Sequence, residues 1–263
     1  MKKQRMVFDL DDVIVVPNIL KIANEVAGTN KTFEDIKTYY MEDTFDFTDE
    51  QRELFYDKLV SDNIYENAKI NEELCSVIKE FSESYDIFIA SDSVIYRREK
   101  QSAKLFFDKY NFIVRNLPYI NSRNIVLCGD KSIVSAKWFI DDKLSNLEQN
   151  ENIQNKLLFP AYHNKSLSDE ELIRKNIVRL KDIPHFKRFV KGCLNENEIR
   201  TTITDMLKIN YQGKIVCEYY NQNKTGNILL NVKCKDENIE LEYEKVNIST
   251  NLKKLLGVDV KCC

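Results

Sequence analysis

The chain has 263 residues, of which 43% are hydrophobic and 11% aromatic, so it can bury a core and is not a disordered chain. Its 39 basic and 42 acidic residues leave a formal net charge of -3, which excludes a global positive field of the kind that attracts nucleic acid. Only 6 glycines and 4 prolines are present, which argues against glycine-rich phosphate loops and dinucleotide-binding sites.

The cysteines and the start of the chain bear on where the protein works. The 7 cysteines are scattered without a C-x-x-C pair, which makes a poor disulfide framework and a poor zinc site. Reduced thiols in the cytoplasm are therefore expected. The basic residues 2–3 precede an apolar run, as in a signal peptide, but three aspartates interrupt that run, and no apolar run approaches membrane-spanning length. We expect a cytoplasmic protein with no membrane partner.

The first half of the chain alternates short apolar strands with helices. Residues 5–10 are apolar and β-branched, which predicts a short buried strand ending at Asp9. Residues 17–84 are predicted to be helical, with a capping box over 48–51 and an N-cap at Asn71. The elements expected next are a strand over 85–90, a helix over about 94–110 with Lys and Arg on its outer face, and strands over 124–128, 136–140 and 156–159.

This alternation is typical of an α/β fold, a Rossmann-like parallel sheet with helices on both faces. In such sheets the ligand binds at the carboxyl ends of the strands. Several polar residues are expected at those ends: Asp9, Ser91, residues 128–131, Asp141 and Asp142. A single sheet would bring them together.

The pattern changes after about residue 185. A helix is expected over 196–209, followed by alternating segments typical of antiparallel strands over 214–220, 227–235 and 239–246. We therefore predict a first domain over 1–185 and a small α+β module over 190–263, joined through the basic stretch 181–191. The module allows oligomerisation or partner contact, but nothing in its sequence indicates a role.

Four motifs follow one another in the predicted first domain. Asp9-Leu10-Asp11-Asp12-Val13 has the pattern D-x-D-x-V after an apolar strand. Ser91 follows the strand over 85–90, Lys131 lies in D-K-x-x-V, and Asp141-Asp142 lie in I-D-D-K. In order and spacing these segments resemble motifs I to IV of the haloacid dehalogenase superfamily. The last two resemble the deoxyribonucleotidase-like 5'-nucleotidases, and the resemblance covers about residues 5–165.

The resemblance implies a phosphatase that works through a phospho-aspartate. Asp9 would be the nucleophile, and Asp11 would protonate the leaving alkoxide and later deprotonate the attacking water. The Ser91 hydroxyl and the Lys131 ammonium would hold the phosphate oxygens.

The same resemblance implies a Mg²⁺ cofactor, which would reduce the repulsion between the carboxylates and a phosphate dianion. Its ligands would be Asp9, the backbone carbonyl of Asp11 and an acidic residue of motif IV. Asp142 is the favoured ligand with Asp141 orienting it, although the sequence leaves their order open.

The insert over about 17–84 would be a small helical C1 cap that closes over the site and selects the substrate. The resemblance implies aromatic side chains that stack on a nucleobase, and Phe45 and Phe47 are the best candidates. The expected substrate is a small phosphorylated molecule, a 5'-(deoxy)ribonucleoside monophosphate. A sugar phosphate or a nucleic-acid 3'-phosphate is the alternative, although nucleic acid is not favoured. A non-catalytic binding or regulatory module is the second alternative.

Several of these residues have competing interpretations. Lys137 competes with Lys131 for motif III, and Ser91 could instead be a helix N-cap, as could Ser93. Asp12 occupies a position that is often Gly in the superfamily; it would alter metal affinity or, as favoured here, face solvent. The two histidines, His163 and His185, are expected to be surface or packing residues.

Overall fold

The computed structural model describes residues 3–191, 215–222, 228–234 and 237–243. The chain divides into two compact units, Met1–Ser166 and Leu167–Cys263. The division into domains over 1–185 and 190–263 stays a prediction. The predicted helix over 196–209 lies outside the described residues.

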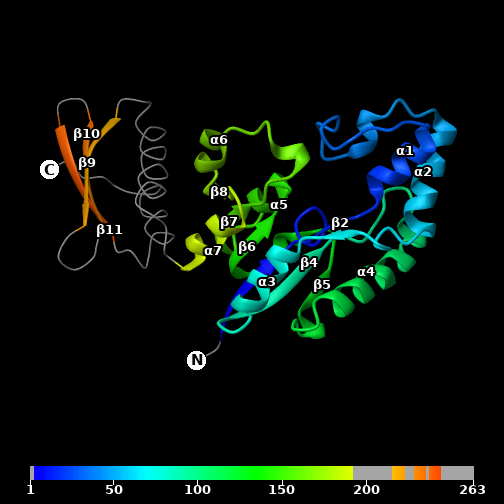
Figure 1. The fold of residues 1–263 in the computed structure, drawn as a ribbon, viewed down its shortest axis with the longest axis horizontal. Coiled ribbons are helices and arrows are strands. Elements are labelled where there is room, and N and C mark those ends of the chain that lie inside the picture. Colours follow the sequence, from blue (N-terminus) through cyan, green and yellow to red (C-terminus); the bar gives the residue numbers. More distant parts are fainter. Residues whose placement is uncertain (1–2, 192–214, 223–227, 235–236, 244–263) are drawn as a thin grey trace. The chain divides into compact units, whose positions relative to one another are not determined.

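A parallel sheet forms the framework of the fold (Figure 1). Its six strands have the order β5-β4-β1-β6-β7-β8. The central strand β1 is buried, with Met6, Val7 and Phe8 at most 2% exposed, because it pairs with parallel neighbours on both sides. The predicted α/β fold is confirmed. The strands are β1 (Gln4–Phe8), β4 (Tyr85–Ser91), β5 (Ile125–Leu127), β6 (Ala136–Asp141), β7 (Ile153–Leu158) and β8 (Ile177–Arg179).

The strand order creates a natural binding place. From β1 the chain passes to β4 and β5 on one side, and then crosses to β6 and β7 on the other side of β1. The connections therefore diverge between β1 and β6, and ligands bind at such a switch point, outside the carboxyl ends of the strands.

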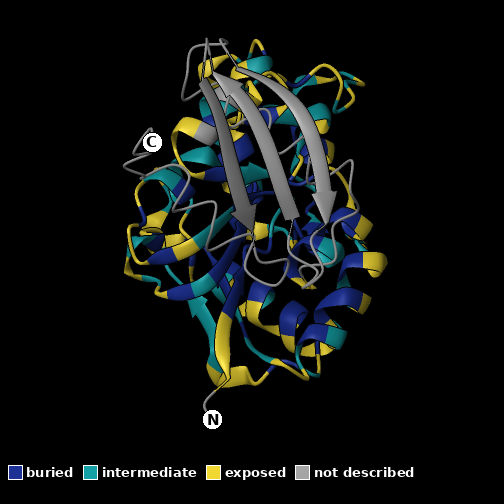
Figure 2. Cartoon of the chain, turned by 90° about the vertical axis from the view of Figure 1, so that its left-hand side faces the viewer, coloured by how far each residue is buried: buried dark blue, intermediate teal, exposed yellow. Residues whose placement is uncertain are grey.

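Several helices are amphipathic, and Figure 2 shows buried and exposed residues alternating along them. In α3 the side chains of Leu74, Val77 and Ile78 are buried at helical spacing, and α3 packs against β4. The Asn71 side chain accepts a hydrogen bond from the Leu74 amide and caps the helix as predicted. The other helices outside the insert are α4 (Ala103–Asn116), α5 (Leu144–Glu148), α6 (Asp169–Arg174) and α7 (Ile183–Lys191); α3 spans Glu72–Phe81.

The cap insert leaves and rejoins the core through two short antiparallel strands, β2 (Val15–Val16) and β3 (Lys69–Ile70). Between them α1 (Ile19–Ala27) and α2 (Asp49–Ser61) pack against each other, away from the sheet (Figure 1). The predicted capping box is present, with Thr48 and Gln51 bonding reciprocally. The insert thus covers residues 17–68, whereas the sequence analysis extended it to 84 and so included α3.

The helix after β4 begins later than predicted, at Ala103 rather than near Val94. Side-chain contacts hold the preceding residues in an irregular loop. Arg98 pairs with Glu53 and Asp57 of α2 at 2.6 Å each, and the Ser102 hydroxyl bonds the Ile95 amide and the Arg98 carbonyl. These local polar contacts compete with helical hydrogen bonds.

The second unit contains an antiparallel sheet of β9 (Ile215–Gln222), β10 (Ile228–Cys234) and β11 (Glu237–Tyr243), in the order β11-β10-β9. The predicted alternation over 214–246 is therefore matched by strands. Among the described residues, no helix is both long and apolar enough to cross a membrane.

Candidate active site

Three buried carboxylates meet where β1 and β6 end. Asp9 follows β1, Asp141 ends β6, and Asp142 comes next; they are 6%, 0% and 2% exposed. One oxygen from each lies within 4.8 Å of the others. The pairing of the strands fixes this meeting, because the Asp9 amide donates to the Ile140 carbonyl at 2.8 Å. The structure thus brings together the motif I and motif IV carboxylates at the switch point.

Lys131 joins these carboxylates. Its ammonium lies 2.7 Å from Oδ2 of Asp9 and 2.8 Å from Oδ2 of Asp141, and the residue is 4% exposed. Burial lowers the pKa of Lys131, but the two carboxylates raise it more, so that it stays above its ordinary value and the side chain is charged. Lys137, its competitor, lies within β6, where its carbonyl bonds Asn155. Of the two lysines, Lys131 is the one that contacts the acidic cluster.

Asp141 and Asp142 have different surroundings. Both Asp141 oxygens accept hydrogen bonds, from Lys131, from the Lys143 amide and from the Asn146 side chain. Asp142 contacts His163 through Oδ2, and its Oδ1 has no hydrogen bond among the described residues. Burial raises the pKa of Asp141 to about 7 and raises that of Asp142 as well. Oδ1 of Asp142 is therefore available to coordinate a metal ion, whereas both oxygens of Asp141 already accept hydrogen bonds.

Asp11 lies beside the carboxylates, with 28% of its side chain exposed. Lys109 of α4 approaches its Oδ2 to 2.9 Å, and the Tyr65 hydroxyl donates to its Oδ1 at 2.8 Å. The same ammonium lies 2.9 Å from the Ser91 hydroxyl and also bonds the Asp92 carbonyl. Asp11 and Ser91, from motifs I and II, are therefore connected through one lysine.

The sequence analysis missed Lys109, because it placed the basic residues of this helix on the outer face. Lys109 is 1% exposed. A signal was present: Leu105, Lys109 and Phe112 are four and three residues apart, which places the lysine on the apolar face. A charge on a buried stripe indicates a buried partner, here Asp11.

Tyr65 is a further contact of Asp11 that the sequence analysis did not single out. It lies in the turn between α2 and β3 and is 2% exposed. Burial, together with the neighbouring Asp11 charge, raises the pKa of Tyr65 well above its ordinary value, so its hydroxyl remains a donor.

His163 is a second residue that the sequence analysis undervalued. Its Nε2 lies 2.6 Å from Oδ2 of Asp142, and 5% of its side chain is exposed. The rings of Tyr39 and Tyr162 meet the imidazole edge to face at 5.1 and 5.0 Å. His163 thus contacts a candidate metal ligand, whereas His185 is buried in α7 as the packing interpretation predicts.

Asp12 does not simply face solvent. It is half-buried, and one of its oxygens lies within 4.8 Å of ligand atoms of Asp142 and His163. Burial and the Asp142 charge raise its pKa, and a hydrogen bond from Tyr162 opposes them. Its φ of 56° lies in the left-handed region, where glycine is favoured.

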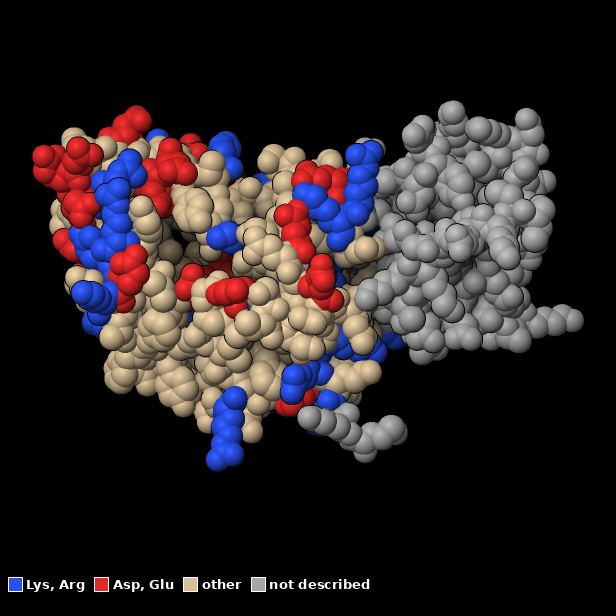
Figure 3. Space-filling view, turned by 180° about the vertical axis from the view of Figure 1, so that it is seen from behind, with Lys and Arg blue, Asp and Glu red and all other residues tan. Residues whose placement is uncertain are grey.

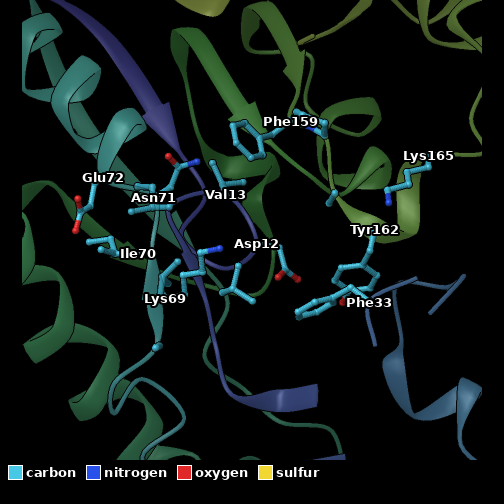
Figure 4. Close-up of a pocket in the computed structure, with 16 residues that line it drawn as sticks. Asp12, Val13, Phe33, Lys69, Ile70, Asn71, Glu72, Phe159, Tyr162 and Lys165 are labelled. Atoms are coloured by element: carbon cyan, nitrogen blue, oxygen red, sulfur yellow. The ribbon is translucent and has the colours of Figure 1, made fainter. Parts of the chain in front are cut away.

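A cavity of 980 Å³ lies beside Asp12 and the cap strands β2 and β3. In Figure 4 the Asp12 carboxylate points toward the rings of Phe33 and Tyr162, whose centroids are 5.1 Å apart. These rings come from the cap and from the segment after β7, so the cavity is shared by cap and core.

The aromatic residues of the cap fall into two groups. Phe45 is 3% exposed and stacks on Phe47 at 5.3 Å, and Phe47 packs on Phe55 of α2. Tyr39 is 40% exposed, and the Lys143 ammonium lies 3.9 Å from its ring centroid. Tyr39 therefore reaches the edge of the sheet beside the acidic cluster, while Phe45 packs in the cap. Nucleobase contact by Phe45 and Phe47 stays a prediction.

On the face shown in Figure 3, acidic side chains lie at a hollow near the middle of the described part. Elsewhere on that face Lys and Arg are mixed with Asp and Glu. This mixture is unlike the continuous basic stripe that nucleic-acid-binding proteins present.

Comparison with known proteins identifies the family. Residues 3–176 match the family described as 5' nucleotidase, deoxy (pyrimidine), cytosolic type C. A relative from Staphylococcus epidermidis is 28% identical over 166 residues, which cover 62% of this chain and 87% of the relative. The 5'(3')-deoxyribonucleotidase of Clostridium acetobutylicum is 29% identical over 168 residues, or 63% of this chain and 87% of the relative. That of Bacillus subtilis is 31% identical over 104 residues, or 40% and 56%.

The family match covers the whole parallel sheet except β8, together with the cap and every residue of the acidic cluster. The chain therefore belongs to the 5' nucleotidase, deoxy (pyrimidine), cytosolic type C family, and is a hydrolase with the haloacid dehalogenase fold.

Proposed function

We propose that the protein is a Mg²⁺-dependent phosphatase that releases phosphate from deoxyribonucleoside monophosphates through a phospho-aspartate at Asp9. The observation that carries this proposal is the buried group of Asp9, Asp141 and Asp142 around Lys131, with Asp11 and Ser91 beside it. The substrate class is supported by the family match and by the relatives named 5'(3')-deoxyribonucleotidase.

Asp9 is suited to nucleophilic attack. Its Oδ1 accepts the Leu10 amide at 2.7 Å and its Oδ2 contacts Lys131, so the carboxylate is held in one orientation. A carboxylate oxygen attacks phosphorus, the bond to the leaving oxygen breaks, and the phosphoryl group stays on Asp9. Asp11 gives its proton to the leaving alkoxide. It then takes a proton from the water that attacks the phospho-aspartate, which releases phosphate and restores Asp9.

The phosphate oxygens need positive charge and hydrogen-bond donors. Ser91, at the end of β4, supplies a hydroxyl, and Lys131, within the D-K-x-x-V segment, supplies an ammonium. Lys109, which is bonded to the Ser91 hydroxyl, adds a second ammonium. Groups fixed in place before the reaction stabilise developing charge without reorganisation.

The residues fit a hard divalent cation. Three buried carboxylates offer oxygen atoms within 4.8 Å of one another, which is the donor type that Mg²⁺ prefers. Asp9 and Asp142 would hold the ion with the Asp11 carbonyl, and Asp141 would orient Lys131 and Asn146 instead. The cation would supply positive charge that offsets the repulsion between these carboxylates and a phosphate dianion.

The experiment is a phosphate-release assay on a panel of substrates, each with Mg²⁺ and with EDTA. The panel contains 5'- and 3'-deoxyribonucleoside monophosphates, ribonucleoside monophosphates, sugar phosphates and 3'-phosphorylated oligonucleotides. We expect Mg²⁺-dependent release that is fastest on the deoxyribonucleotides. Faster release from a sugar phosphate or an oligonucleotide would reassign the substrate, and strong salt dependence would accompany the oligonucleotide. Release from none would contradict the proposal.

A further inference from the structure

Both oxygens of the Asp11 carboxylate are held, each by a donor from a different part of the fold. The Tyr65 hydroxyl, from the cap insert, donates to Oδ1 at 2.8 Å. The Lys109 ammonium, from core helix α4, lies 2.9 Å from Oδ2. Asp11 itself lies in the loop after β1, and these are the two hydrogen bonds of its carboxylate among the described residues.

The two donors are themselves rigidly supported. The turn that carries Tyr65 is closed by the Asn63 side chain, which accepts the Tyr65 amide at 3.1 Å. The Tyr65 ring packs on Phe112 of α4 with centroids 5.3 Å apart. Lys109 has further bonds to Ser91 and to the Asp92 carbonyl. Cap and core therefore present both donors at fixed positions.

We propose that Tyr65 and Lys109 are positioning residues that hold Asp11 in the orientation for proton transfer, with the cap supplying one of the two. This inference rests on the proposed function, in which Asp11 is the general acid and base. A group that transfers a proton must lie within hydrogen-bond reach of the reacting oxygen, and a misplacement of about 1 Å costs about 100-fold in rate. The exposed 28% of the Asp11 side chain leaves it accessible to a substrate.

Leaving groups of different basicity separate this role from simple support of the fold. The alkoxide that leaves a nucleoside monophosphate is strongly basic and needs the proton from Asp11. The p-nitrophenolate that leaves p-nitrophenyl phosphate is weakly basic and departs without it. Hydrolysis of the phospho-aspartate needs Asp11 as a base with either substrate, so the comparison is made on kcat/KM, which covers the steps up to departure of the leaving group. A residue that orients Asp11 therefore lowers kcat/KM on the nucleotide much more than on the aryl ester, while a residue that supports the fold lowers both equally.

The test compares kcat/KM on a deoxyribonucleoside monophosphate and on p-nitrophenyl phosphate. Tyr65→Phe removes only the hydroxyl, and we expect kcat/KM on the nucleotide to fall about tenfold or more, as for the loss of a hydrogen bond to a charged group. Its kcat/KM on the aryl ester should change less than about threefold. Lys109→Met is the second variant, with the larger loss again on the nucleotide. Because Lys109 also contacts Ser91, the KM of Lys109→Met rises for both substrates.

Matched controls come from the same structure. Tyr119→Phe removes a hydroxyl that donates to the Cys75 carbonyl at 2.8 Å, and Lys104→Met removes an exposed ammonium of α4 that pairs with Asp108. Neither control variant should change kcat/KM on the nucleotide or on the aryl ester. Asp11→Asn gives the benchmark ratio of the two losses. Adding Tyr65→Phe to Asp11→Asn should cause no further loss on the nucleotide, because the acid is already absent. Melting temperatures establish that each variant is folded.

The outcomes separate the two levels of the proposal. Equal losses of kcat/KM on both substrates, or unchanged kcat/KM in both Tyr65→Phe and Lys109→Met, would overturn the positioning role while leaving the phosphatase intact. A wild type that releases phosphate from neither substrate would overturn the proposed function, and the positioning role with it.

Discussion

The edge of the sheet that carries the acidic cluster and the interior of the cap are both buried, but charged side chains form the first and aromatic side chains form the second. At the sheet edge the Lys131 ammonium lies 2.7 Å from Asp9 and 2.8 Å from Asp141. In the cap, Phe45 and Phe47 stack at 5.3 Å in a mainly aromatic cluster. Buried charges cost free energy unless they are paired, whereas buried rings stabilise by their area alone. The paired charges at the sheet edge fit the site proposed above, whereas the rings of the cap contribute to stability.

The largest expected effect comes from the nucleophile. Asp9→Asn keeps the shape of the side chain but replaces the attacking oxygen with an amide, so phosphate release should fall about 10³-fold or more. Turnover of a deoxyribonucleotide by the purified variant, with its melting temperature as the control for folding, is the measurement. Turnover at the wild-type rate by folded Asp9→Asn would show that Asp9 is not the nucleophile.

Next comes the buried ion pair. Lys131→Met leaves Asp9 and Asp141 without their shared cation, so the free energy of unfolding should fall by about 3–5 kcal/mol. Lys58→Met is the control, since Lys58 pairs with Asp62 at 3.0 Å on the surface and should contribute less than about 1 kcal/mol. Urea unfolding measures both. Equal losses of unfolding free energy in the two variants would mean that the buried ion pairs of Lys131 stabilise the protein no more than an exposed pair does.

A smaller effect is expected at His163. His163→Gln removes the 2.6 Å partner of Asp142, and outer partners of metal ligands typically change metal affinity by about 10–100-fold. Calorimetric titration of the protein with Mg²⁺, in the absence of substrate, should show weaker binding by about tenfold. His185→Gln, in α7, is the control. Unchanged Mg²⁺ affinity in His163→Gln would contradict the assignment of Asp142 as a metal ligand supported by His163.

The smallest effect concerns Asp12. Asp12→Gly relieves the left-handed backbone at φ 56° and removes a carboxylate near Asp142, so the metal-free protein should gain about 1 kcal/mol of unfolding free energy. Urea unfolding in EDTA measures the change. A loss of stability would show that the Asp12 side chain contributes contacts that outweigh its strain.

The sequence predicted which residues lie at the carboxyl edge of the sheet better than it predicted the contacts of the cap. Asp9, Ser91 and Asp141 each follow or end an apolar run, so the strand pattern alone places them at one edge of a parallel sheet. Tyr65 escaped prediction because its partner, Asp11, is distant in the chain and is reached only through packing. Lys109 was missed although its spacing from Leu105 and Phe112 places it on the apolar face of its helix. Likewise, no local pattern distinguishes Tyr39, which contacts Lys143, from Phe45, which packs in the cap.

The start of α4 was missed for a related reason. Residues 94–102 have helical propensity, but Arg98 is held by Glu53 and Asp57 from the cap, and this tertiary contact determines the loop. The cytoplasmic location and the role of the module over 190–263 stay predictions.

The most direct test of the central claim is to look for the phosphoryl group on Asp9. The enzyme is mixed with a deoxyribonucleoside monophosphate and Mg²⁺, quenched in acid within the first turnover, and digested for mass spectrometry. The account predicts that the peptide containing Asp9 carries one phosphoryl group, that Asp9→Asn carries none, and that EDTA abolishes the signal. An active enzyme with no phosphorylated peptide, or with the phosphoryl group on another residue, would contradict it.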